Sequence, residues 1–224
     1  MKLAIPLAES QVVAAGRVHA MLQDWKSADR VLGYLAATLP RNTDYDQVLL
    51  KAAALNQLYG TNVRYLHAMG RHIAQVFSSQ PPYQDECSLV EWVADLEASG
   101  KQHESFASKY CHFFVDNRRF PLYDRYARET VRLHLGRGNY RCKHTSQTYR
   151  NFHSDLSSLR AQLGFHPSIR ELDHYLWLRS QWQAYDAGKR LGAEVSGLFE
   201  RSGRDSSIRL LVDAMCGGPR RSGL

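Results

Sequence analysis

The chain has few cysteines and no paired cysteine motif. Its four cysteines in 224 residues are widely separated, and none stands in a Cys-x-x-Cys motif. Because zinc ribbons and iron–sulfur clusters need closely spaced thiolates, this spacing argues against both kinds of site. Cys111-His112 and Cys142-Lys-His144 leave a ligand set assembled in space as an alternative, although ten histidines make such neighbours common by chance. We expect reduced thiols, no metal and no cofactor.

Long apolar runs are missing as well. The stretch at residues 1–9 is too short for a signal peptide, and no later segment approaches the ~18 consecutive apolar residues of a membrane span. The sequence therefore predicts a soluble, cytoplasmic protein, associated with the nucleoid if the source is a prokaryote.

The chain also lacks low-complexity tracts, internal repeats and the alternating pattern of strands. Apolar residues recur instead at helical spacing, with Ser27 expected as one N-cap and Pro40 and Gly60 as breakers. We predict an all-α protein forming one compact unit with two lobes, followed by a flexible tail at 217–224. The expected helices cover residues 9–25, 27–39, 44–59, 63–77, 88–98, 102–115, 122–135, 146–163, 168–189, 193–200 and 207–215.

Positive charge is concentrated in one part of the chain. The whole protein carries a net charge of +7, and residues 117–150 alone hold nine Lys and Arg against two acids, which is the same excess. Such a segment favours an anionic partner, because phosphate contacts release counterions. An ordinary solvated surface or an acidic protein partner remains the alternative, and the basic loop at 136–141 is either a phosphate-binding loop or a linker.

Two stretches carry the functional prediction. In the first, an apolar segment at 48–55 predicts a helix buried in a bundle and runs into the polar residues Asn56 and Gln57. In the second, Ser105-Phe-Ala-Ser-Lys109 is followed by Phe120-Pro-Leu-Tyr-Asp124. Together, over residues 44–136, they resemble the helix-hairpin-helix DNA glycosylase superfamily, and in particular its 8-oxoguanine DNA glycosylase branch.

The resemblance implies a two-lobed fold and a catalytic pair. In that branch a hairpin ends in a nucleophilic lysine, and a later aspartate begins another helix; Lys109 and Asp124 follow this order. Ser105–Ser108 stands where the branch usually has a Gly-x-Gly turn. Lys109 would attack C1′ of the sugar, and the Asp124 carboxylate would stabilise the oxocarbenium-like transition state. The alternative is that Lys109 is a surface lysine and Asp124 only a helix cap.

The resemblance also implies contacts with DNA. A base must rotate out of the duplex, and residues at the end of the first helix would fill the gap that it leaves. Hairpin serines and arginines beyond the aspartate would contact backbone phosphates. The implied DNA-binding residues are Asn56, Gln57, Tyr59, Ser105, Ser108, Arg125 and Arg128, each of which also has an ordinary structural or solvated interpretation.

These observations define one prediction and several alternatives. We expect a monomeric DNA glycosylase, with a core at 44–136 that carries the site and with 1–43 and 137–216 packed around it. It would release a modified or damaged base from double-stranded DNA, with strand cleavage by the lysine as an additional activity. The alternatives are a glycosylase for hypermodified bases of phage DNA in antiviral defence, and a non-catalytic nucleic-acid-binding protein of the same fold.

Overall fold

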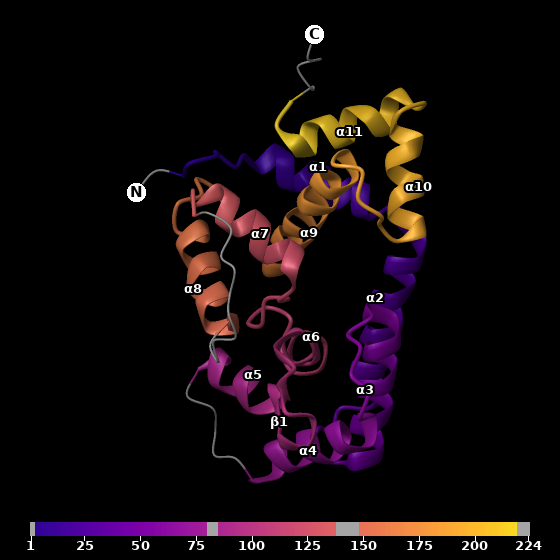
Figure 1. Cartoon of the computed structure of the whole chain (residues 1–224), viewed down its shortest axis with the longest axis vertical. Coiled ribbons are helices and arrows are strands. Elements are labelled where there is room, and N and C mark those ends of the chain that lie inside the picture. The colour runs from indigo at the N-terminus through magenta and orange to yellow at the C-terminus, as the bar shows by residue number, and fades with distance from the viewer. Residues whose placement is uncertain (1–2, 80–84, 138–147, 219–224) are drawn as a thin grey trace. The chain divides into compact units, whose positions relative to one another are not determined.

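The computed structural model describes residues 3–79, 85–137 and 148–218, and these residues are almost entirely helical (Figure 1). The all-α prediction is therefore confirmed. Among the helices in these ranges, none has the length and apolar character required to traverse a membrane. The helices are α1 (Glu9–His19), α2 (Gln23–Thr38), α3 (Tyr45–Tyr59), α4 (Leu66–Ser79), α5 (Glu86–Ala94), α6 (Glu104–Phe114), α7 (Arg125–His134), α8 (Thr148–Arg160), α9 (Ile169–Asp186), α10 (Ala193–Ser202) and α11 (Ser206–Cys216).

The chain divides into two compact units. The described part of unit 1 comprises residues 3–26, 124–137 and 154–218, and that of unit 2 comprises 27–79, 85–123 and 148–153. Helices α2 and α8 each contribute residues to both units. The predicted core of 44–136 does not coincide with either unit, because the division falls between Tyr123 and Asp124. Of the predicted tail, residues 219–224 lie outside the described ranges.

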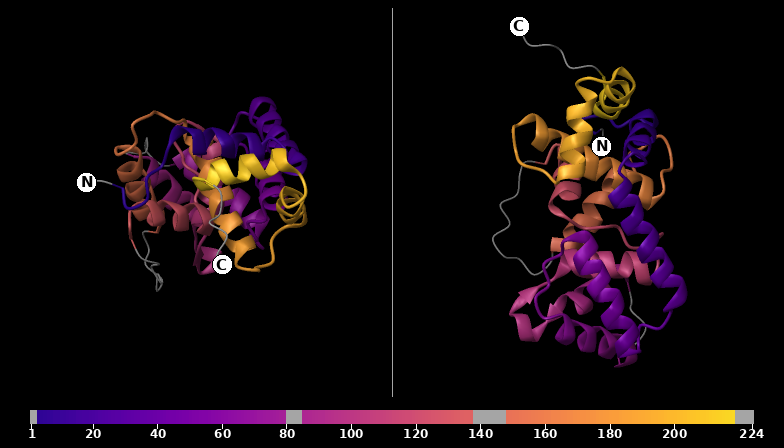
Figure 2. Two further views of the ribbon diagram at one scale, coloured as in Figure 1. Left: turned by 90° about the horizontal axis from the view of Figure 1, so that it is seen from above. Right: turned by 90° about the vertical axis from the view of Figure 1, so that its right-hand side faces the viewer.

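Unit 1 is built around α9. Helix α1 packs against α9 and α11, and α7 packs against α9 (Figures 1 and 2). The Thr130 hydroxyl donates to the Leu176 carbonyl oxygen at 2.7 Å, which ties α7 to α9. His134 is buried between the Ile5 carbonyl oxygen and the Tyr175 hydroxyl, both at 2.8 Å, and its burial lowers the pKa of the imidazole.

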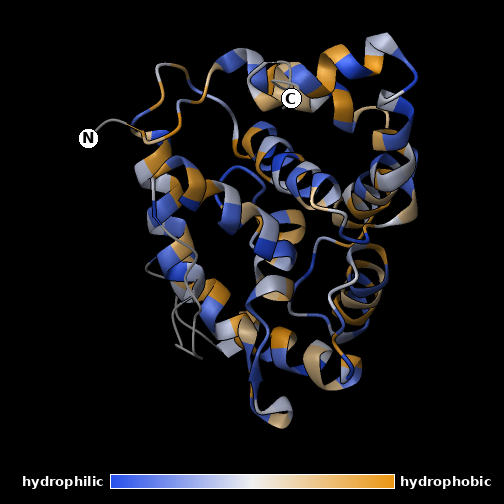
Figure 3. Ribbon diagram, turned by 45° about the horizontal axis from the view of Figure 1, so that its top comes forward, coloured by the Kyte–Doolittle hydropathy of each residue, from blue (hydrophilic) through white to orange (hydrophobic). Residues whose placement is uncertain are grey.

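Unit 2 packs α3 against α4, α5 against α6, and α3 against α6. Its helices begin and end at residues suited to those positions. The Asp44 carboxylate accepts the Gln47 N–H at 3.1 Å, and Gly60 adopts φ +57° after the last turn of α3. Figure 3 shows that most helices carry both hydrophobic and hydrophilic residues, as expected for helices with one face in a core.

A short hairpin in unit 2 departs from the predicted helices. Strand β1 (Asp95–Leu96) pairs antiparallel with β2 (Lys101–Gln102), in the register Asp95 with Gln102 and Leu96 with Lys101. A 3-10 turn over Glu97–Ser99 and Gly100, at φ +60°, joins them. The helix predicted for 88–98 therefore ends at Ala94.

The first two predicted helices are also divided at a different place. The break falls at Ala20–Leu22 rather than after Trp25, and Ser27 lies inside α2 instead of capping it. In the first turn of α2, the Asp24 N–H donates to the Glu194 carboxylate at 3.0 Å. This contact with a residue 170 positions away offers no local sequence signal.

Candidate active site around Lys109

Residues 105–109 lie in helix α6, within the range 102–115 predicted to be helical. Ser105 and Ser108 lie within α6, which begins at Glu104 and continues through Lys109. The segment is helical, as predicted for 102–115, so the phosphate-binding turn of the family is not formed at Ser105–Ser108. Its physical basis, glycines that tolerate positive φ, is absent from a segment whose residues all adopt helical conformations.

Lys109 is a buried lysine with a defined set of acceptors. The residue is 5% exposed. Its Nζ donates to Ser105 Oγ at 2.9 Å, to the Ser105 carbonyl oxygen at 3.3 Å and to the Tyr123 carbonyl oxygen at 3.0 Å. The last of these oxygens belongs to the peptide group that joins Tyr123 to Asp124. The amine is therefore held beside the backbone that leads into the predicted carboxylate.

Residues 120–123, here called the strap, are held by polar side chains of α6. The Tyr123 N–H donates to Ser108 Oγ at 3.1 Å, and His112 Nδ1 donates to the Phe120 carbonyl oxygen at 2.7 Å. His112 lies four residues after Ser108 and three after Lys109, so it is a neighbour of both on the surface of α6. His112 is thus a packed histidine that anchors the strap.

Asp124 begins α7 in unit 1. Its carboxylate accepts the Ala127 N–H at 2.8 Å, so the residue is an N-cap as well as a candidate catalytic group. Arg125, with 63% of its side chain exposed, lies 3.9 Å from Glu129 and stacks over the Tyr126 ring. Arg128, one turn further on, is partly buried. Arg125 therefore presents its charge to solvent, as a phosphate contact requires.

The polar residues at the end of α3 have different environments. Asn56 Oδ1 accepts from the Val63 N–H and the Thr61 hydroxyl, both at 2.8 Å, and its amide donates to the Val63 carbonyl oxygen at 3.2 Å. The Tyr59 hydroxyl donates to Asp29 at 2.5 Å. Gln57 is exposed. Asn56, Gln57 and Tyr59 were predicted to fill the gap left by an extruded base. Of these three, Asn56 closes the turn after α3, and Gln57 is the one most accessible to a partner.

Part of the basic segment is paired with acids. Arg119 lies 2.7 Å from Glu86, and Arg150 lies 2.7 Å from Glu91. In unit 1, Arg132 and Arg137 both pair with Asp155. The local charge of the segment is therefore lower than its composition indicates. Its residues Arg141 and Lys143 lie outside the described ranges, as does most of the predicted basic loop.

A second buried lysine in unit 2 was not predicted from the sequence. Lys51 on α3 is 1% exposed and donates to the carbonyl oxygens of Leu39 and Arg41 at 3.1 Å and to Asn42 Oδ1 at 2.5 Å. Burial lowers the pKa of Lys51 to about 8, while the charge of Asp44 opposes this change. The only sequence signal was a lone cation in the apolar run 48–55.

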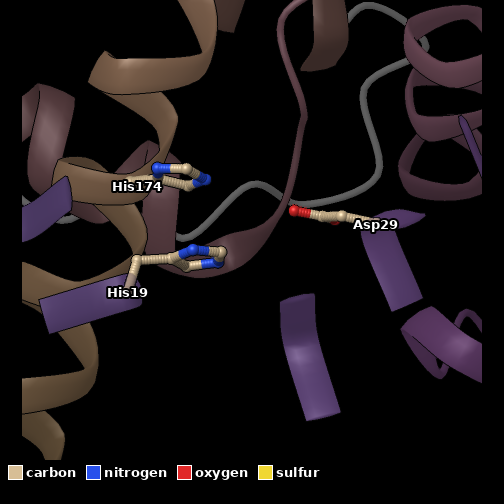
Figure 4. Close-up of side chains that lie close together, drawn as sticks. All are labelled: His19, Asp29 and His174. Atoms are coloured by element: carbon tan, nitrogen blue, oxygen red, sulfur yellow. The ribbon is translucent and has the colours of Figure 1, made fainter. Parts of the chain in front are cut away.

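Of the cysteine and histidine neighbours considered as metal ligands, Cys111 and His112 are buried. Burial raises the pKa of the Cys111 thiol, which is inaccessible to solvent. Cys142 and His144 lie outside the described residues. In unit 1, His19 and His174 stack with ring centroids 3.7 Å apart (Figure 4). Two imidazoles are fewer than the three or four protein ligands of a zinc site, so this pair alone does not define one.

A pocket of about 590 Å³ lies elsewhere in unit 2. Residues of α4 such as Arg71 and Gln75 line it, together with Trp92 and the 95–98 turn. None of its lining residues is a predicted site residue.

Comparison with known proteins adds one partial match. Residues 12–119 match a family model described as an N-terminal domain. This segment is slightly less than half of the chain; it contains Lys51 and Lys109 and ends before Asp124. No curated protein and no solved structure matches the chain.

Proposed function

We propose that this protein is a DNA glycosylase that extrudes a modified base from duplex DNA and cleaves its glycosidic bond. The observation that carries the proposal is the position of Lys109 Nζ, 3.0 Å from the carbonyl oxygen of the residue that precedes Asp124. This contact supports pairing the Lys109 amine with the Asp124 carboxylate, the two groups that the reaction needs. The sequence resemblance supports the same pair.

The chemistry follows from these two groups. The nitrogen lone pair of Lys109 attacks C1′, the bond from C1′ to the base nitrogen breaks, and its electron pair leaves with the base, which then takes up a proton. The Asp124 carboxylate stabilises the positive charge that develops on the sugar. An ammonium group has no lone pair, so Lys109 must lose a proton before attack. Opening of the sugar ring then gives a Schiff base, from which β-elimination can cut the strand.

The proposed substrate is double-stranded DNA with a modified base. Extruding a nucleotide costs a few kcal/mol, which contacts with the duplex must offset. Arg125 and Gln57 are exposed enough to make such contacts. Oxidised guanine and hypermodified bases of phage DNA are the two substrate classes, corresponding to repair and antiviral defence. The protein would act as a cytoplasmic monomer.

The test incubates the protein with duplexes that carry different modified bases, with and without borohydride. Free base and a covalent adduct at Lys109 are the expected products. Lys109→Gln should remove the adduct and lower base release at least about a hundredfold, because the nucleophile is gone. Asp124→Asn should lower base release while largely sparing DNA affinity. Unchanged release in either variant would refute its assignment.

A second candidate function is non-catalytic DNA binding by the same fold. The hydrogen bonds of Lys109 and Ser108 to the Tyr123 backbone favour this alternative, because they give both side chains a structural role. This alternative predicts salt-dependent binding to duplex DNA with no base release and no adduct on any duplex. Binding that is insensitive to salt would disfavour both candidates.

A further inference from the structure

The amine of Lys109 is occupied in the observed conformation. An ammonium group has three N–H donors, and Lys109 places three oxygens within hydrogen-bonding distance of Nζ, at 2.9, 3.0 and 3.3 Å. Only 5% of the residue is exposed. A reagent or substrate carbon therefore has little access to this nitrogen until at least one acceptor moves.

One acceptor, from outside α6, belongs to Tyr123. Two of the three oxygens belong to Ser105, one turn earlier in the same helix, and they move with Lys109. Tyr123, in contrast, is held at both ends of its backbone. Its N–H donates to Ser108 Oγ at 3.1 Å, and its carbonyl oxygen accepts from Lys109 at 3.0 Å. Two consecutive residues of α6, Ser108 and Lys109, are therefore both hydrogen-bonded to the backbone of Tyr123 in the strap.

We propose that the strap is a latch that keeps Lys109 inactive, and that the amine becomes reactive only when Tyr123 separates from α6. This inference rests on the proposed role of Lys109 as a nucleophile, and it adds a means of regulation to that site. Ser108 is the positioning residue of the latch. It is fully buried, so its hydroxyl has no competing contact with bulk solvent.

A ligand that binds the residues after Tyr123 could act on the latch through the chain itself. Asp124 follows Tyr123 directly and caps α7, and Arg125 follows Asp124. A duplex that engages Asp124 and Arg125 acts on the peptide group that Lys109 holds. Release of the amine would then accompany engagement of DNA, which would limit reaction of the lysine with other electrophiles.

The first experiment measures the reactivity of individual lysines without DNA. Formaldehyde and cyanoborohydride methylate accessible amines, and mass spectrometry gives the rate at Lys109 and, as an internal control, at Lys51. Ser108→Ala removes one hydrogen bond from Tyr123 and should raise the Lys109 rate about fivefold, with the Lys51 rate unchanged. An unchanged Lys109 rate, or an equal rise at both lysines, overturns the latch.

A second measurement needs no variant. In wild-type protein at low urea, methylation of Lys109 and hydrogen exchange of the Tyr123 amide should report the same opening equilibrium. Lys51 should open only with the whole of unit 2. If Lys109 follows Lys51 instead of Tyr123, the amine is exposed by global unfolding and the latch is wrong.

A third arm separates the latch from the proposed function. A duplex with an abasic site presents an aldehyde at C1′, and borohydride traps the amine that condenses with it. Trapping at Lys109 that becomes faster in Ser108→Ala supports both proposals. Faster methylation in Ser108→Ala with no trapping in either protein supports the latch and removes the glycosylase.

Discussion

The described part of unit 2 contains two buried lysines that share their burial and their number of acceptors and differ in the segment to which they are bonded. Lys51 and Lys109 are both under 6% exposed, and each donates to three oxygens. Lys51 holds the segment that follows α2, through the carbonyl oxygens of Leu39 and Arg41. Lys109 instead holds the strap, which leads out of unit 2 into Asp124. Burial of an amine is therefore not enough to identify a reactive lysine.

Lys51 lies in a network of further contacts within unit 2. Asn42 Oδ1 accepts from Lys51 and also from the Tyr110 hydroxyl at 2.9 Å, while the Asn42 amide donates to the Phe114 carbonyl oxygen at 2.9 Å. The rings of Tyr110 and Phe114 lie 5.8 and 5.3 Å from the ammonium nitrogen. The side-chain acceptor of Lys51 is thus itself held by two further contacts. Lys51 is bonded to the segment that follows α2, whereas Lys109 is bonded to the residue that precedes Asp124, and this difference in partner, rather than the number of acceptors, separates the structural lysine from the candidate nucleophile.

Replacement of Lys51 should have the largest effect on stability among the changes that test this comparison. Lys51→Met removes the donor from two partly buried carbonyl oxygens, those of Leu39 and Arg41, and should lower the free energy of unfolding of unit 2 by about 3 kcal/mol. The matched variant Lys109→Met should cost only about 1 to 2 kcal/mol, because the strap can move to find water. Urea unfolding of the two variants measures the difference. A larger loss in Lys109→Met would reverse the assignment of the structural lysine.

The second test uses pH. Burial sets the pKa of Lys51 at about 8 in the folded state, below its ordinary value of 10.5. Below pH 8 both states hold the proton; between pH 8 and 10.5 the unfolded state holds more protons, so this group makes stability rise with pH. Burial raises the pKa of Cys87 and of Tyr110, which acts in the opposite direction at high pH. The Lys51 contribution is therefore read as the difference between wild type and Lys51→Met.

A flat difference between pH 8 and 10.5 would contradict this sign. It would mean that the three acceptors stabilise the ammonium form enough to cancel the cost of burial.

The smallest expected effect concerns Asp124. Asp124→Ala removes the N-cap of α7 and should lower stability by about 1 kcal/mol, whereas Asp124→Asn should change it by only a few tenths, because asparagine caps helices equally well. Thermal unfolding measures both variants. The proposed catalytic role predicts, in addition, that both variants lose base release. Activity in Asp124→Asn together with instability in Asp124→Ala would leave the residue as a cap alone.

Periodicity in the sequence predicts most helices because each buries one face. It fails where the boundary depends on distant partners, as at Asp24, whose N–H is bonded to Glu194. The 95–102 hairpin is too short for an alternating pattern to be visible.

The candidate site shows the same limit. Burial of Lys109 does not fit the alternative of a surface lysine, and Asp124 caps the start of α7 as expected. Two of the three acceptors of Lys51, in contrast, are backbone oxygens twelve and ten residues away, and any residue type presents these. Side-chain identity therefore gave little indication of that network.

The buried thiols of unit 2 provide a natural probe of opening. Cys87 and Cys111 lie in the core of unit 2, whereas Cys216 at the end of α11 in unit 1 is only partly covered. Thiolates are the reactive species, and burial disfavours them at Cys111. A thiol-specific dye should therefore modify Cys216 in the native protein and reach Cys111 only as the helices around Lys109 come apart, so a single chromophore can time the two events separately.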